Sequence, residues 1–103
     1  MFLVLWEFDV KPGSELRFES VYGSNGDWAQ LFRRDAHYQQ TRLLRDLSRP
    51  QTYLALDTWE SQESYALFKS QNREAYEALD KTCEALTDAE RFLGSFEQPG
   101  KTR

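Results

Sequence analysis

The stretch YQQTRLLRDLSRPQTYLALDTW, residues 38–59, decides the fold of this chain. It holds two extended segments, 38–47 and 52–59, whose residues alternate between two faces, as in β-strands. The turn-forming residues Ser48-Arg49-Pro50-Gln51 separate the two segments. We therefore expect two neighbouring strands at the centre of the chain.

Helical patterns lie on both sides of this pair, and a strand lies at each end of the chain. The segments around 14–22 and 27–32 precede it, and those around 61–70 and 72–86 follow it. The outermost segments, 2–8 and 91–96, are rich in apolar and aromatic residues. This order predicts an α+β, ferredoxin-like βαββαβ domain over residues 1–98, with a four-stranded antiparallel sheet and a loose tail over 99–103.

Local signals predict where two of the helices begin. Asp27 and Gln30 have the spacing of a capping box, with Asp in place of Ser or Thr. Ser61 is a good N-cap for the helix that carries Tyr65 and Phe68.

The first strand predicts that both faces of the sheet are covered. Alternation places Phe2 and Trp6 on one face and Leu3 and Leu5 on the other, so both faces begin apolar. Arg42, Asp46 and Asp57 lie in the middle of strands, where unpaired charge is costly. We expect Arg42 to pair with Asp57 or Asp46; the alternatives are a wet cavity or a subunit interface.

The composition narrows the class of function. The 103 residues include seven Phe, five Tyr and three Trp, and the net charge of −4 argues against a nucleic-acid partner. No apolar run is long enough to span a membrane. One cysteine, Cys83, permits no internal disulfide and indicates a reducing, cytoplasmic compartment; its place on an apolar helix stripe predicts a buried side chain. One His and scattered carboxylates predict no metal site.

The segment Trp59-Glu60-Ser61-Gln62-Glu63-Ser64-Tyr65-Ala66-Leu67-Phe68-Lys69-Ser70 resembles the strand-to-helix junction of the antibiotic biosynthesis monooxygenase family. The opening strand with Lys11-Pro12-Gly13 is similar too. The resemblance implies a homodimeric α+β barrel whose subunits press their sheets together, with a ligand cavity between each sheet and its helices. It also implies oxygenation without a cofactor. Haem-degrading relatives carry a helix histidine where this chain has Ala78, so no haem is expected.

Such an oxygenase binds an electron-rich aromatic or polyphenolic substrate, deprotonates it and shields it while it reacts with O2. The candidate bases are His37 and Asp57, although a lone histidine before a strand is often a solvated loop residue. The residues that we expect to line the pocket are Tyr22, Trp28, Arg42, Trp59 and Tyr65. The aromatics among them could instead be core residues. The alternative function is a non-catalytic, small-molecule-binding or stress-associated dimer with the same fold.

Overall fold

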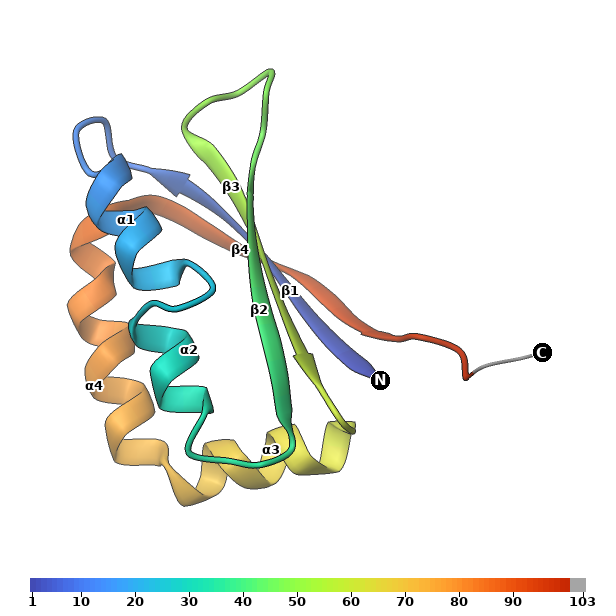
Figure 1. The fold of residues 1–103 in the computed structure, drawn as a ribbon. Coiled ribbons are helices and arrows are strands. Elements are labelled where there is room, and N and C mark those ends of the chain that lie inside the picture. The colour runs from blue at the N-terminus through green and yellow to red at the C-terminus, as the bar shows by residue number, and fades with distance from the viewer. Residues whose placement is uncertain (101–103) are drawn as a thin grey trace.

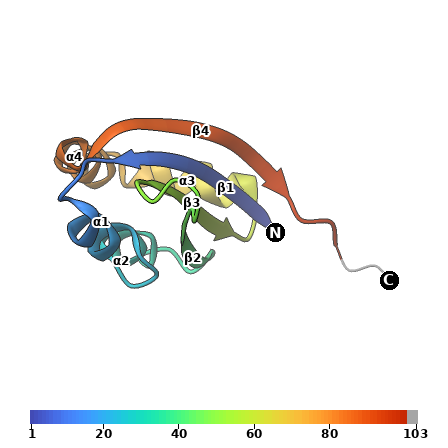
Figure 2. The same ribbon diagram turned by 90° about the horizontal axis from the view of Figure 1, so that it is seen from above.

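Four antiparallel strands and four helices form two layers in the computed structural model, which describes residues 1–100 (Figure 1). The strands are β1 (Phe2–Val10), β2 (Tyr38–Arg45), β3 (Thr52–Trp59) and β4 (Thr87–Glu97). The helices are α1 (Glu15–Tyr22), α2 (Asp27–Phe32), α3 (Gln62–Gln71) and α4 (Arg73–Cys83), and a 3₁₀ turn, η1 (Glu84–Leu86), follows α4. The sheet order is β2-β3-β1-β4, and the sheet curls around the helical layer (Figure 2). The predicted ferredoxin-like fold is confirmed.

The central hairpin has the predicted strands with one difference. β3 spans the predicted residues, whereas β2 ends at Arg45, two residues before the predicted end. The cause is Asp46, whose carboxylate accepts hydrogen bonds from the backbone N–H groups of Ser48 and Arg49 and so begins the turn.

An aromatic core joins the sheet to the helices. Trp59 is fully buried, and its ring lies 5.1 to 5.5 Å from the rings of Phe32, Tyr38, Tyr65 and Phe68. Such pairs contribute about 0.5–1.5 kcal/mol each beyond the area that they bury. Cys83 is buried on α4, as predicted.

Of the two predicted helix caps, the one at the start of α3 is confirmed and the one at the start of α2 is not. At α3, the Ser61 hydroxyl accepts from the Ser64 N–H, and the Ser64 hydroxyl accepts from the Ser61 N–H, so Ser61 caps the helix as predicted. The predicted capping box at Asp27 is wrong. The N-cap of α2 is Gly26, and the Gln30 amide instead donates to the carbonyl of Asn25. Within residues 1–100, no helix has the length and apolar character needed to cross a membrane.

The outer face of the sheet, opposite the helices, has two zones. The first, which we call the apolar zone, consists of Leu3, Leu5, Leu44, Leu54, Leu56 and Phe96. Leu44 and Phe96 are 42% and 50% exposed, although both carry large apolar side chains. An apolar zone left open to water in this way is typical of a surface that binds a partner.

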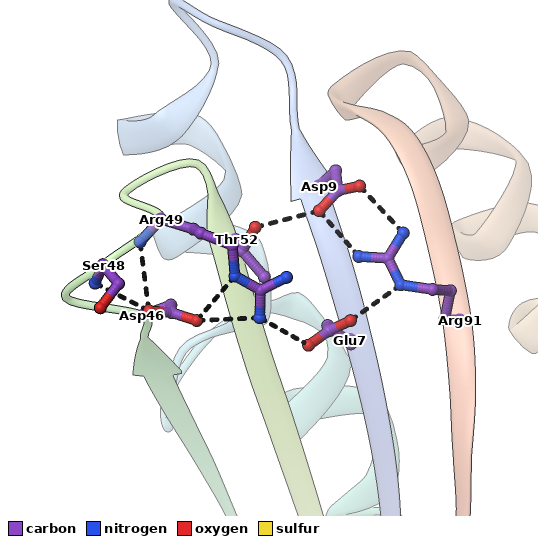
Figure 3. Close-up of polar contacts among 7 residues, drawn as sticks. All are labelled: Glu7, Asp9, Asp46, Ser48, Arg49, Thr52 and Arg91. Carbon is purple, nitrogen blue, oxygen red and sulfur yellow. Dashed lines mark hydrogen bonds and ion pairs between the residues drawn. The ribbon is translucent and has the colours of Figure 1, made fainter.

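The second zone is a network of charged side chains that crosses three strands (Figure 3). Arg91 of β4 donates to both carboxylate oxygens of Asp9, at 2.9 and 2.8 Å, and to Glu7 at 2.8 Å. Arg49, in the hairpin turn, lies 2.9 Å from Asp46 and 3.4 Å from Glu7. The hydrogen bond from Arg91 is the main reason why the pKa of Asp9 is lowered.

Arg42 takes no part in this network. The expected pairing of Arg42 with Asp57 is wrong, because the two side chains lie on opposite faces of the sheet. Asp46 pairs with Arg49 instead.

β4 contains a bulge that changes its register against β1. Leu5 pairs with Gly94 and Trp6 pairs with Phe92, so Leu93 is an extra residue. Gly94 has a φ of +145°, a value that side chains rarely allow. The strand ends at Glu97. Residues 99 and 100 lie outside it, and the rest of the expected tail, 101–103, lies outside the described residues.

Candidate functional site

A cavity of about 260 Å³ lies between the inner face of the sheet and the helices. Every strand and every α-helix contributes to its wall. Its lining residues are mostly aromatic, and three are acidic: Trp6, Phe8, Tyr22, Trp28, Phe32, Thr41, Ala55, Asp57, Tyr65, Tyr76, Asp80 and Glu90. A concave aromatic wall with a few polar groups is typical of a small-molecule site.

Asp57 is the deepest carboxylate in this wall. It lies in the middle of β3, opposite Thr41 of β2, and alternation turns both side chains inward. The Thr41 hydroxyl donates to Asp57 Oδ1 at 2.6 Å, and the Tyr38 hydroxyl lies 2.6 Å from the Thr41 oxygen. Because Thr41 uses its proton on Asp57, Tyr38 donates to Thr41. The chain of hydrogen bonds therefore holds Asp57 in one orientation.

Burial raises the pKa of Asp57 from 3.8 to about 6, and the hydrogen bond from Thr41 opposes this shift. The group is therefore ionised at neutral pH and is a stronger base than an ordinary carboxylate. A carboxylate of this kind, facing a cavity, can accept a proton from a bound ligand.

Three tyrosine hydroxyls also line the cavity. Burial raises the pKa of Tyr22, Tyr65 and Tyr76 above the ordinary value, so all three stay protonated. A protonated tyrosine hydroxyl that is not engaged with a neighbouring side chain can donate a hydrogen bond to an oxygen atom of a ligand.

Asp80 of α4 and Glu90 of β4 line the solvent-exposed mouth of the cavity. Partial burial is the main cause that raises the pKa of each carboxyl group. Glu84 repels both, and Asp80 also raises the pKa of Glu90. The mouth is therefore acidic. No group of three or more possible metal ligands occurs in the part of the chain that the structure describes.

The structure brings four of the predicted site residues to the cavity: Asp57, Tyr22, Trp28 and Tyr65. Trp59 lies behind the wall, fully buried against Tyr65.

The structure places the other two predicted site residues elsewhere. His37 lies in the exposed turn between α2 and β2, where its Nδ1 atom is 2.8 Å from Asp35. Arg42 is exposed on the outer face of the sheet. An exposed turn and an outward position in the strand keep both side chains away from the cavity.

Sequence reasoning missed several lining residues, among them Thr41, Tyr76, Asp80 and Glu90. Thr41 could have been predicted from the sequence, because the hairpin register pairs it with Asp57 and so places both side chains on the same face of the sheet. Asp80 and Glu90 could not have been predicted, since α4 and β4 meet at the cavity only through the tertiary fold.

Solved structures of other proteins share this fold. A mutant form of SnoaB, a cofactor-independent oxygenase from Streptomyces nogalater, is 20% identical and has a TM-score of 0.78; the match covers 97% of this chain and 94% of that one. A second SnoaB structure matches with the same identity and coverage and a TM-score of 0.77. A conserved protein from Methanosarcina mazei Go1 is 12% identical over 95% of this chain and 92% of that one, with a TM-score of 0.70.

A search of the curated proteins gives no match. The sequence model of the family described as antibiotic biosynthesis monooxygenase matches residues 1–82, from β1 through nearly all of α4. The resemblance found in the sequence around Trp59 is thus confirmed over most of the domain. This chain belongs to the antibiotic biosynthesis monooxygenase family.

Proposed function

We propose that the protein is a monooxygenase that uses O2 on a small aromatic or polyphenolic substrate without a resident cofactor. The observation that carries the proposal is the ionised carboxylate of Asp57, held by Thr41 inside an aromatic cavity. Membership of the family supports it, as does the shared fold with SnoaB, which is a cofactor-independent oxygenase.

The chemistry begins with a proton transfer. Asp57 takes the hydroxyl proton of a bound phenol, and the resulting phenolate gives one electron to O2. The two radicals combine at a ring carbon to form a hydroperoxide. Loss of water from this intermediate leaves one oxygen atom on the substrate. The substrate supplies all four electrons that reduce O2, so no other reductant is needed.

The size of the cavity restricts the substrate. A volume of about 260 Å³ is slightly below the usual range of small-molecule sites, about 300–1,000 Å³. We infer a ligand of one or two rings, with its hydroxyl group directed at Asp57.

The test uses 1,4-dihydroxynaphthalene under ¹⁸O2. The proposal predicts 2-hydroxy-1,4-naphthoquinone with one ¹⁸O atom, and the second ¹⁸O atom in water. Spontaneous oxidation gives the unlabelled quinone and hydrogen peroxide instead. If the enzyme adds nothing to the spontaneous rate, although the compound binds, the non-catalytic alternative is favoured.

Substitutions test the identity of the base. Asp57→Asn should lower the rate at least 100-fold, because the amide cannot accept the proton. Asp88→Asn, an exposed change on β4, is the matched control and should keep the rate. His37→Ala should also keep it, and a large loss in this variant would overturn the assignment of Asp57.

We also propose that the protein is a cytoplasmic homodimer. The apolar zone on the outer face supports the dimer, because a second copy of the same sheet would cover Leu44 and Phe96. The presence of a single cysteine, Cys83, supports the cytoplasm.

A further inference from the structure

The cavity has an unbalanced charge. Asp57 lies in its interior, and Asp80 and Glu90 lie at its mouth. In the described part of the chain, no Lys, Arg or His is among the residues that line it. The lining therefore has three carboxylates, and the charge of Lys69, which lies outside the lining, acts on Asp80.

The proposed reaction does not relieve this imbalance. When Asp57 takes a proton, its negative charge moves to the phenolate, so the cavity still holds three negative charges. Like charges at short range in a poorly solvated site repel strongly. The tyrosine side chains carry no positive charge, and Lys69 acts on Asp80 alone among the three carboxylates, so a cationic ligand would supply the charge that the lining lacks.

We propose that the substrate is a hydroxylated aromatic amine that binds as a cation, with its ammonium group at the mouth beside Asp80 and Glu90 and its ring hydroxyl at Asp57. This inference rests on the proposed function and names the substrate class of the same site. The ammonium group would also make the phenol more acidic, which assists the proton transfer to Asp57.

The aromatic wall suits a cation as well as a ring. An ammonium group is attracted to the face of an aromatic ring within about 6 Å. Lys69 shows this attraction at the same wall, because its Nζ atom lies 5.2 Å from the centroid of Tyr65 and 5.1 Å from that of Tyr76. Lys69 lines the neighbouring groove, which Asp80 also lines, and its charge opposes the rise in the pKa of Asp80. It therefore offsets part of the negative charge at the mouth without being among the residues that line the cavity.

A bound cation would reduce the electrostatic repulsion among the carboxylates at the mouth. Asp80 and Glu90 repel each other, and Glu84 repels both. A positive charge beside them removes this repulsion. An anionic ligand would add to it, so the same site should reject carboxylates.

Calorimetry without oxygen tests the inference independently of turnover. The probes are tyramine, 4-ethylphenol and 4-hydroxyphenylacetate, which share one phenol ring and differ in charge. We expect tyramine to bind about tenfold more tightly than 4-ethylphenol, and 4-hydroxyphenylacetate to bind most weakly. The preference for tyramine should shrink as salt is added.

A double variant assigns the preference to the mouth. Asp80→Asn with Glu90→Gln should bring tyramine to the affinity of 4-ethylphenol, whose binding should stay the same. The control, Asp88→Asn with Glu97→Gln, changes two exposed residues of β4 that do not line the cavity and should keep the preference.

Two results would overturn the inference: equal or reversed affinities across the three probes, or no binding of tyramine at millimolar concentration. Neither result bears on whether the enzyme consumes oxygen with a neutral quinol. Conversely, the protein could select tyramine but consume no oxygen with any phenol. That result would support the cation-binding site and contradict the proposed reaction.

Discussion

At the scale of single residues, Asp57 shows how a base is maintained at the expense of stability. The pKa of its carboxyl group is about 6 in the folded chain, against an ordinary value of 3.8. A carboxyl group whose pKa is raised by folding makes its full contribution to the stability of the fold at a pH below its unfolded value, here 3.8. This contribution is lost as the pH rises through the folded value, about 6. At pH 8 the ionised group thus costs the folded state about 2–3 kcal/mol.

Asp57→Asn should therefore raise the free energy of unfolding at pH 8 by about 1–3 kcal/mol, although it lowers the rate of turnover. At pH 4, where the native carboxyl group is already neutral, the same variant should gain little. Urea unfolding at the two pH values measures the difference. An equal effect at both would mean that burial does not raise this pKa.

Thr41 sets the pH at which the base works. Its hydroxyl stabilises the ionised carboxylate, so Thr41→Val should raise the pKa of Asp57 further and move the acid limb of the pH–rate profile to higher pH. Thr41→Ser keeps the donor and should restore the limb. If both variants show the native profile, Thr41 has no part in tuning the base.

At the scale of secondary-structure elements, the cap of α3 fixes one wall of the cavity. Ser61 and Ser64 exchange hydrogen bonds at the start of the helix, and Tyr65 follows directly after them. Ser61→Ala should lower the free energy of unfolding by about 1 kcal/mol, because it leaves N–H groups of the first turn without a partner.

Ser70, which is exposed at the other end of α3, provides the matched control for this substitution. Ser70→Ala should change the stability by less than about 0.5 kcal/mol. Denaturation of the two variants side by side gives the comparison. Equal effects would show that the capping box does not stabilise the helix.

These elements also show what local sequence can and cannot predict. A capping serine predicted the start of α3, because a helix cap depends on nearby residues. Asp27 and Gln30 had a suitable spacing, yet Gly26 became the N-cap of α2. The pairing of Arg91 with Asp9 joins residues 82 positions apart, so no local pattern could indicate it.

At the scale of the whole molecule, the outer face should decide the oligomeric state. We expect light scattering at micromolar concentration to give a dimer. Phe96→Lys places a charge in the apolar zone and should shift the protein to a monomer. Leu67→Lys, a similar change at a 53%-exposed position on α3, should leave the dimer intact. A native protein that is monomeric under these conditions would contradict the proposal.

The whole-molecule arrangement was only partly accessible from the sequence. The order of strands and helices was enough to predict the ferredoxin-like topology, and the family resemblance implied a cavity between the sheet and the helices. The acidic mouth was not predictable, since Asp80 and Glu90 are exposed, ordinary-looking residues of α4 and β4. Only the tertiary fold shows that both residues line the same cavity.

The extra residue at Leu93 has a consequence for how this protein can be redesigned. In an unbroken strand, Phe92 and Phe96 would point to the same side, since they are four positions apart. The bulge lets Phe92 pack against Trp6 at the cavity while Phe96 pairs with Leu3 on the outer face. One strand thus presents two phenylalanines to opposite faces of the sheet. A change at Phe92 alters the contact with Trp6 at the cavity, and a change at Phe96 alters the apolar zone.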